Sequence, residues 1–407
     1  LMDEQEAITK AQALLNRPGD ANVSPLAVYR RAAKADSVQQ RRPNVVLIMM
    51  ESMSAKFMKH FGQSETLTPF LDSLYTRSIS FRNFYSAGIH TNHGLYATLY
   101  SFPAMMKRNL MKGSVIPRYS GLPTVLKENG YYNLFFMTHE GQYDNMNAFF
   151  RTNGYDEVFS QEDYPADKVV NSFGVQDDFL YDYAIPVLNQ RAATGQPFFA
   201  TLLSISNHPP YVIPPFFHPK TSEPEMQIVE YADWALRQFF EEARKQPWFD
   251  NTIFVLEGDH GKLVGDAECE LPESYNHIPL MIYSNRIQPE EKTAFGGQVD
   301  IQPTILGLLN IDYLQNNFGV DLLKEERPCM FYTADNMVVG RNDTLLYLYN
   351  YETQQELTYD IGNGKLNAVP MDDSFLPLKE YSFSMLQSAE FLVKHGKTLN
   401  SIPFTQQ

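Results

Sequence analysis

The sequence predicts an α/β fold with a mostly parallel central sheet and helices on both faces. Short apolar runs alternate with amphipathic stretches from residue 44 to about residue 310. Strands buried on both faces have such apolar runs, and strands that alternate with helices form βαβ units. From about residue 311 onward, period-two alternation broken by turn residues predicts a small C-terminal antiparallel β subdomain with a closing helix.

Five apolar runs are the predicted strands of the main sheet. They are VVLIMM (45–50), NLFFMT (133–138), FFATLLSIS (198–206), TIFVLE (252–257) and IPLMIYS (278–284). Helical periodicity predicts helices over residues 68–77, 122–130 and 230–246, and a closing helix over residues 379–395. Gly130 and Pro247 follow two of these helices as a C-terminal cap and a helix breaker.

These patterns divide the chain into three predicted domains. Residues 1–43 are polar, with a helical stretch over 3–16 and a basic pair, Arg41 and Arg42. We expect them to form a helical lead-in that packs on the main body or links it to a membrane part missing from this chain. Residues 44–310 form the α/β domain, and residues 311–407 form a small α+β subdomain.

Composition limits the classes of function. The chain has 407 residues, of which 43% are hydrophobic, and a formal net charge of −15. A negative charge of this size argues against binding to nucleic acid, which requires basic patches. Two cysteines cannot supply a disulfide framework, and the absence of any run of 18 apolar residues predicts no transmembrane helix within these residues.

Acids and histidines follow the predicted strands. Glu51 follows the first run, His139 the second and His208 the third, and Asp259 and His260 follow the fourth. Ligands of open α/β sheets bind at the carboxyl ends of the strands. One histidine alone would be an ordinary core or surface residue, but together with two acids these histidines indicate a metal or catalytic cluster.

Three further polar residues are candidates for substrate binding. Asp144 and Asn145 lie in a loop beyond a predicted strand, where functional residues are common. His277 stands just before the last run and could support the cluster from outside.

A carboxylate, an Asp-His pair and a hydroxyl suit a divalent cation, with Mn²⁺ as the expected ion and Mg²⁺ or Zn²⁺ as alternatives. Thr91 is the candidate nucleophile, because it precedes the helix-like run GLYATLYSF, whose N-terminus would direct N–H groups at an anion. The alternative is that Thr91 only caps that helix.

Seven motifs together resemble a known family. NVVLIMMES, IHTNHG, THEGQYDN, SNHPPY, EGDHG, NHIPLMIYS and GGQVDIQPTILGLL stand in the order found in the sulfatase branch of the alkaline phosphatase superfamily. The chain is most similar there to lipoteichoic-acid synthase-like phosphoglycerol transferases, and the resemblance covers residues 44 to about 365.

The resemblance implies a role for each matching residue. Glu51, Thr91, Asp259 and His260 would hold the metal, and Thr91 would also carry the transferred group as a covalent intermediate. His208 would contact the phosphate and act as acid or base. His139 would face the substrate.

The implied activity is metal-dependent transfer of phosphoglycerol, or a related phospho-alcohol, from a phospholipid head group to a glycan or lipid acceptor. The resemblance places it on the extracytoplasmic face of a bacterial membrane, attached through a segment absent from this chain. Two positions that hold Trp and Arg in lipoteichoic-acid synthases hold Asp144 and Met146 here.

Other activities of the same fold stay open. They are hydrolysis of a phosphodiester and hydrolysis of a sulfuric ester. The loop HTNHG lacks the C/S-x-P-x-R motif of true sulfatases, which argues against the second. A non-catalytic binding domain is a further alternative, against which the four intact metal-ligand positions argue.

Overall fold

The computed structural model describes residues 1–16, 29–31 and 42–399. Its central sheet has eight strands in the order β5-β4-β6-β2-β7-β8-β3-β9. The strands are β2 (Asn44–Met50), β3 (Ile79–Tyr85), β4 (Tyr132–Phe136), β5 (Glu157–Phe159), β6 (Phe198–Leu203), β7 (Thr252–Gly258), β8 (Leu280–Tyr283) and β9 (Glu290–Gly297). Only β8 runs antiparallel to its neighbours in this sheet, so the predicted mostly parallel sheet is confirmed.

Both faces of the sheet are covered by helices, as predicted. Alternate residues of β2 divide between two cores, with Val45, Leu47 and Met49 in one and Val46, Ile48 and Met50 in the other. The first core includes side chains of α3 (Thr91–Tyr100), α4 (Leu122–Glu128), α5 (Met146–Thr152) and α8 (Ile301–Leu308). The second includes side chains of α2 (Pro69–Tyr75), α6 (Asp177–Ala193) and α7 (Pro224–Ala243).

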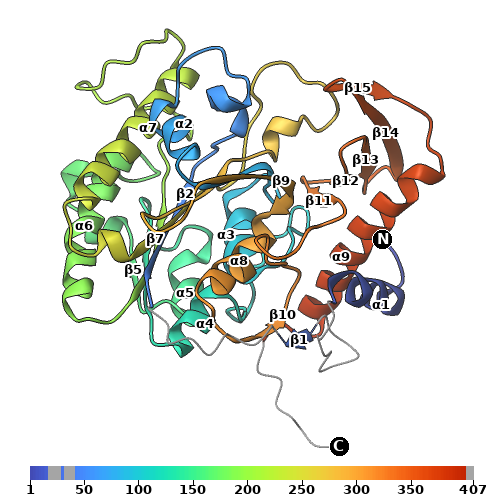
Figure 1. Cartoon of the computed structure of the whole chain (residues 1–407), viewed down its shortest axis with the longest axis horizontal. Helices are drawn as coiled ribbons and strands as arrows, with labels where there is room; N and C mark the ends of the chain where they lie inside the picture. Colours follow the sequence, from blue (N-terminus) through green and yellow to red (C-terminus); the bar gives the residue numbers. More distant parts are fainter. Residues whose placement is uncertain (17–28, 32–41, 400–407) are drawn as a thin grey trace, which may run out of the picture.

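A separate five-stranded antiparallel sheet lies to one side of this body (Figure 1). Its strands are β11 (Met330–Thr333), β12 (Met337–Arg341), β13 (Leu345–Asn350), β14 (Gln355–Gly362) and β15 (Lys365–Ala368). The closing helix α9 (Leu376–Lys394) packs against β11 and β12. The predicted C-terminal β subdomain and its closing helix are therefore confirmed.

The N-terminal helix α1 (Glu4–Leu15) packs along α9 of the C-terminal subdomain. Lys10 pairs with Glu380, and Lys394 with Glu4, each at 3.2 Å. Short strand β1 (Tyr29–Arg31) pairs with β10 (Leu314–Asn316). Arg41 of the predicted basic pair lies outside the described residues.

The three-domain division stays a prediction. Strands β1 and β10 pair residues of the first predicted domain with residues of the third. Within the described parts of the chain, no helix has both the length and the apolar character needed to cross a membrane.

The sheet order determines where the predicted site residues meet. Strands β4, β6, β2 and β7 are adjacent and parallel, so their carboxyl ends lie at one edge of the sheet. Glu51 follows β2, and Asp259 follows β7, which pairs directly with β2. The loops after β4 and β6 carry His139 and His208 to the same edge.

Candidate active site

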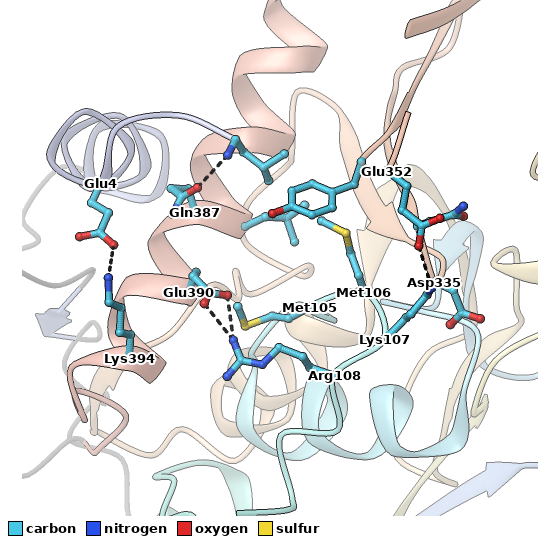
Figure 2. A pocket seen from close by; sticks show the side chains of 14 residues that line it. Glu4, Met105, Met106, Lys107, Arg108, Asp335, Glu352, Gln387, Glu390 and Lys394 are labelled. Carbon is cyan, nitrogen blue, oxygen red and sulfur yellow. Dashed lines mark hydrogen bonds and ion pairs between the residues drawn. The ribbon is translucent and has the colours of Figure 1, made fainter. Parts of the chain in front are cut away.

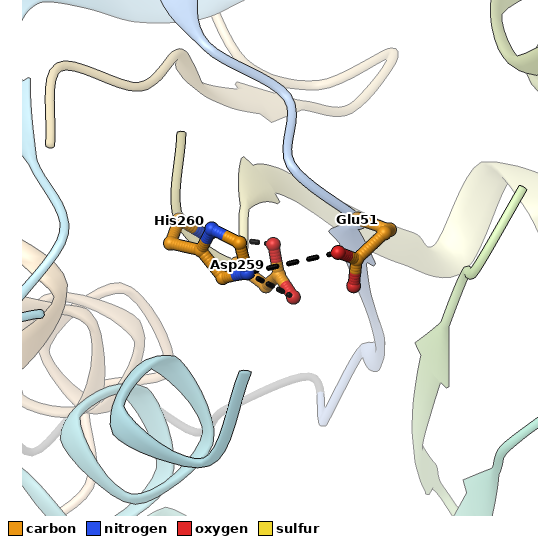
Figure 3. A group of neighbouring side chains, drawn as sticks. All are labelled: Glu51, Asp259 and His260. Carbon is orange, nitrogen blue, oxygen red and sulfur yellow. Dashed lines mark hydrogen bonds and ion pairs between the residues drawn. The ribbon is translucent and has the colours of Figure 1, made fainter. Parts of the chain in front are cut away.

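Glu51, Asp259 and His260 form a compact cluster at the ends of β2 and β7 (Figure 3). One potential ligand atom from each lies within 4.8 Å of those from the other two. The His260 Nε2 atom is 3.6 Å from Glu51 Oε1 and 3.6 Å from Asp259 Oδ2. Both carboxylates are buried, and the His260 side chain is 12% exposed.

Ser52 fixes one oxygen of each carboxylate. Its backbone N–H donates to Asp259 Oδ1 at 2.8 Å, and its hydroxyl donates to Glu51 Oε1 at 2.8 Å. The N–H of His260 also donates to Asp259 Oδ1, at 2.7 Å. Ser52 has a positive φ of 50°, a conformation that costs free energy in a residue other than glycine and is common at functional sites. These bonds leave Glu51 Oε2 and Asp259 Oδ2 facing Thr91.

The ring of His260 is held in the tautomer that a metal ligand needs. Its Nδ1 atom lies 2.7 Å from the carbonyl oxygen of Gly261, which can only accept a hydrogen bond. The proton of the neutral ring therefore resides on Nδ1. The lone pair on Nε2 then faces the two carboxylates and is available to a cation.

Thr91 brings a hydroxyl to the same point. Its Oγ1 lies 2.9 Å from Asp259 Oδ2 and 3.3 Å from Glu51 Oε2. The structure does not support the alternative that Thr91 caps the helix, because His90 is the N-cap residue of α3 and Thr91 is its first residue. The Thr91 hydroxyl is therefore directed at the cluster.

Close backbone packing holds α3 against the end of β7. A Cβ atom on Gly94 would lie 2.2 Å from the carbonyl oxygen of Asp259, so only glycine fits there. The side-chain amide of Gln298 donates to that same carbonyl at 2.8 Å and accepts from the N–H of Ala87 at 2.9 Å. Gln298 thus ties the loop before Thr91 to the strand that carries Asp259.

The electrostatics of the cluster favour a bound cation. Burial and the charge of Glu51 raise the pKa of Asp259 well above its usual value. Burial also acts to raise the pKa of Glu51, but His260 and hydrogen bonds from Asp259 and Ser52 outweigh it and lower that pKa. Two buried carboxylates this close cannot both ionise easily without a positive partner. Two carboxylates, an imidazole lone pair and a hydroxyl fit a divalent metal ion.

We expect Mn²⁺ to stabilise the chain against unfolding and Asp259→Asn to remove this stabilisation. At a free Mn²⁺ concentration 100-fold above Kd, the gain is about 2.7 kcal/mol. Asn mimics the protonated acid, so Asp259→Asn should leave the metal-free stability unchanged within about 1 kcal/mol. Denaturation with Mn²⁺ and with chelator measures both effects, and an equal Mn²⁺ shift in the variant would contradict the metal site.

The same site predicts a pH dependence. The pKa of Asp259 is higher in the folded state than in the unfolded state. Asp259 therefore makes its full contribution to the stability of the metal-free chain at a pH below the unfolded-state pKa. This contribution is lost as the pH rises through the folded-state pKa. Mn²⁺ binds the ionised carboxylate and competes with protons for Asp259, and the raised pKa of Asp259 strengthens this competition. The Mn²⁺ affinity is therefore expected to fall as the pH is lowered.

His139 and His208 lie at the rim of the cluster. Burial lowers the pKa of His139, and the negative charges of Asp144 and Glu51 act in the opposite direction. His208 helps to lower the pKa of Glu51. The Nδ1 atom of His208 is 2.6 Å from the carbonyl oxygen of Pro209, and its ring lies 4.0 Å from that of Phe173. This arrangement leaves Nε2 of His208 without a protein partner among the described contacts.

The other three candidates have structural contacts. Asp144 pairs with Lys112 at 3.0 Å, and Asn145 donates to the carbonyl oxygen of Met111 at 2.9 Å. His277 Nε2 lies 2.7 Å from the carbonyl oxygen of Arg82, and its ring stacks on Tyr85. No contact among the described residues joins these three side chains to the cluster. Their roles in substrate binding stay predictions.

The sequence analysis did not single out Ser52, Gln298 or Lys262. Lys262 Nζ donates to Asn207 Oδ1 at 2.8 Å and to the Tyr211 hydroxyl at 2.9 Å. Burial lowers the pKa of Lys262 to about 8, although the charges of Glu51 and Glu225 act in the opposite direction. Of these three residues, only Lys262 could have been found from the sequence, because it lies two residues after the predicted metal ligand His260.

A cavity of about 630 Å³ lies elsewhere, beside α9 (Figure 2). The basic groups that line it are paired, Lys107 with Glu352 at 2.7 Å and Arg108 with Glu390 at 2.9 Å. Asp335 lines it too and lies 2.6 Å from Nε2 of His90, the residue before Thr91. The cavity thus adjoins the Thr91 loop, but none of the four cluster residues lines it.

A family model described as Sulfatase matches residues 43–311, more than half of the chain. The chain belongs to the sulfatase family. The match spans all eight strands of the central sheet and all four cluster residues.

Among curated relatives of this sulfatase-family chain are synthases and a transferase. It is 24% identical over 315 residues to "Lipoteichoic acid synthase 2" of Bacillus subtilis, a match that covers 70% of this chain and 47% of the relative. It is 25% identical over 322 residues to "Phosphoglycerol transferase I" of Xanthomonas campestris, covering 74% and 46%. The chain therefore spans about half the length of these relatives.

Solved structures share the fold. A protein in the alkaline phosphatase superfamily from Vibrio parahaemolyticus has a TM-score of 0.86 and 26% identity, with 98% of each chain covered. The lipoteichoic acid synthase LtaP of Listeria monocytogenes has a TM-score of 0.76 and 20% identity, with 95% of this chain and 98% of that chain covered. The resemblance inferred from the seven motifs is thus confirmed.

Proposed function

We propose that this sulfatase-family chain is a metal-dependent transferase that moves phosphoglycerol, or a related phospho-alcohol, through a covalent intermediate on Thr91. The observation that carries the proposal is the position of the Thr91 hydroxyl, 2.9 Å from Asp259 Oδ2 and beside Glu51. The names of the relatives support the substrate class. The donor would be a phospholipid head group, and the acceptor would be a glycan or a lipid.

The residues suggest a two-step reaction. A divalent ion at Glu51, Thr91, Asp259 and His260 would lower the pKa of the Thr91 hydroxyl and offset phosphate charge. The Thr91 hydroxyl releases its proton to water, Oγ1 attacks phosphorus, and the bond from phosphorus to the lipid alcohol breaks. Protonated His208 gives its Nε2 proton to the departing oxygen. In the second step His208 takes the proton of an acceptor hydroxyl, whose oxygen attacks the Thr91 phosphodiester, and the bond from phosphorus to Oγ1 breaks. Thr91 leaves in its deprotonated form, which can react with the next donor or regain a proton from water.

The first turn of α3 supports the same phosphate position. Thr91 is the first residue of this helix, and the N–H groups of a first turn have no partners within the helix. Such groups bind anions. A group held on Thr91 would lie beside them.

The proposal is tested by incubation of the Mn²⁺-loaded chain with vesicles that contain labelled phosphatidylglycerol or phosphatidylethanolamine. We expect diacylglycerol release from one of the two lipids and a mass increase of the protein by one head-group phosphate. A chelator-treated sample is the control. Absence of both products with both lipids would contradict the proposal.

Two same-fold alternatives give different products. A phosphodiesterase would release the free head-group phosphate and would not transfer it to an added alcohol or glycolipid. A sulfuric-ester hydrolase would cleave an aryl sulfate. The Thr91 loop argues against the latter, because neither free cysteine, Cys269 nor Cys329, belongs to it.

Location at the extracytoplasmic face of a bacterial membrane belongs to the same proposal. A phospholipid donor requires a membrane surface. Three further points stay predictions. They are attachment to the membrane through a segment outside this chain, the choice of Mn²⁺ over Mg²⁺ or Zn²⁺, and the boundaries of the catalytic domain at residues 44–310.

A further inference from the structure

Lys262 lies in the loop after β7, two residues beyond His260. Its ammonium group donates to two neutral oxygens, Asn207 Oδ1 at 2.8 Å and the Tyr211 hydroxyl at 2.9 Å. It also lies 5.4 Å from the centre of the Phe57 ring. All of these partners are uncharged.

Lys262 has no carboxylate partner within the described part of the chain. Among the residues that the structure describes, no Asp or Glu oxygen lies within the 4.0 Å of an ion pair with its Nζ atom. Lys107 and Lys379, by contrast, pair with Glu352 at 2.7 Å and with Glu356 at 2.5 Å. A half-buried cation with only neutral partners is costly, and an anion that binds beside it would offset this cost.

A short chain of hydrogen bonds connects Lys262 to the cluster. Asn207 accepts from Lys262 and donates through Nδ2 to the carbonyl oxygen of Ser52 at 3.2 Å. Ser52 in turn bonds both carboxylates of the cluster. Asn207 also directly precedes His208, so Lys262 is tied to the loop that carries the proposed acid and base.

We propose that Lys262 binds a non-bridging oxygen of the phosphate that is transferred to Thr91. The inference rests on the proposed function, and it names the side chain that recognises the phosphate anion of the substrate. Glu51 and Asp259 carry as much negative charge as a divalent cation carries positive charge. The ion and the two carboxylates therefore carry no net charge to match that of the phosphate. The ammonium group of Lys262 adds positive charge there, beside His208 and the N–H groups of α3.

The test is equilibrium binding of glycerol 1-phosphate, measured by calorimetry on the Mn²⁺-loaded chain. Lys262→Met is expected to weaken this binding roughly 10- to 100-fold, because a hydrogen bond between two charged groups is lost. Lys262→Gln keeps a polar side chain but no charge and should weaken it similarly. Lys262→Arg keeps the charge and should bind within about 5-fold of the original chain.

Two controls separate recognition from folding. Lys107→Met removes an equal charge from an exposed ion pair and should leave the affinity unchanged. Direct titration with Mn²⁺ alone should give the same affinity in all variants within about 3-fold, which shows that the cluster is intact.

Equal affinity for glycerol 1-phosphate in the original chain, Lys262→Met and Lys262→Gln would overturn the inference. So would a loss of affinity that Lys262→Arg fails to restore. Failure of the proposed function has a separate signature, namely no turnover of either phospholipid by the original chain. The calorimetric comparison does not depend on turnover.

Discussion

Replacement of Thr91 by valine is expected to reduce phospholipid turnover by about 10⁴-fold or more and to abolish the covalent intermediate. Valine has the shape of threonine without its hydroxyl, so the first turn of α3 should keep its place against Asp259. Removal of a nucleophile eliminates the covalent route altogether and leaves only the weak effect of binding and charge stabilisation. Diacylglycerol release and the intact mass of the protein measure the two losses.

Thr91→Ser is the matched control. Serine keeps the hydroxyl but lacks the methyl group that restricts the side-chain torsion of threonine. We expect it to lose about 10-fold in turnover, since the nucleophile remains but is less well positioned. Its protein mass should still increase by one head-group phosphate.

Turnover of Thr91→Val at a rate similar to Thr91→Ser would contradict the covalent mechanism. The folding cost of Thr91→Val should be small, about 1 kcal/mol, because it removes the hydrogen bond to Asp259 Oδ2. Denaturation of the variant therefore distinguishes a chemical loss from a folding defect.

The strands that carry the site could be predicted because burial dictates their sequence. Strand β2 is buried at every residue, and after Asn44 it is a continuous apolar run, which is typical of a strand covered on both faces. Strands β3 and β9 were not predicted. Strand β9 lies at the sheet edge and reads EEKTAFGG, so its exposed part has no apolar pattern, and only pairing with β3 defines it.

Helix α6 was also not predicted, because its local sequence does not favour a helix. It contains Pro186, and an interior proline argues against a helix when the sequence is considered alone. Leu180, Tyr181 and Leu188 pack into the core beneath the sheet, and this tertiary packing outweighs the local preference.

Glu51, Asp259 and His260 could be predicted because each follows an apolar run, and parallel strands bring their carboxyl ends to one edge of the sheet. Thr91 was placed with them by the family resemblance. Their supporting residues could not be predicted. Gln298 contacts Ala87 and Asp259, which are 211 and 39 residues away along the chain. Contacts of this kind depend on the complete fold and leave no local pattern.

Arg327→Met is expected to destabilise the fold by about 3–5 kcal/mol, because it leaves the charge of Asp300 buried and unpaired. Both side chains are fully buried, and Arg327 Nη2 lies 2.5 Å from Asp300 Oδ1. Arg327 also donates to the Tyr381 hydroxyl at 2.6 Å, which joins the start of α8 to the closing helix α9. Chemical denaturation of the metal-free chain measures the change in the free energy of unfolding.

Two variants decide whether the unpaired charge causes the loss. In Arg108→Met, the guanidinium that is removed also contacts both carboxylate oxygens of a glutamate, Glu390, at 2.9 Å. This pair is exposed, so we expect the free energy of unfolding to fall by less than about 1 kcal/mol.

Asp300→Asn combined with Arg327→Met removes both charges and should recover at least about 1 kcal/mol relative to Arg327→Met alone. If Arg327→Met costs no more than Arg108→Met, the closing helix does not depend on this ion pair. A double variant that is no more stable than Arg327→Met would instead assign the loss to the hydrogen bonds that Arg327 makes to Tyr381 and Phe318.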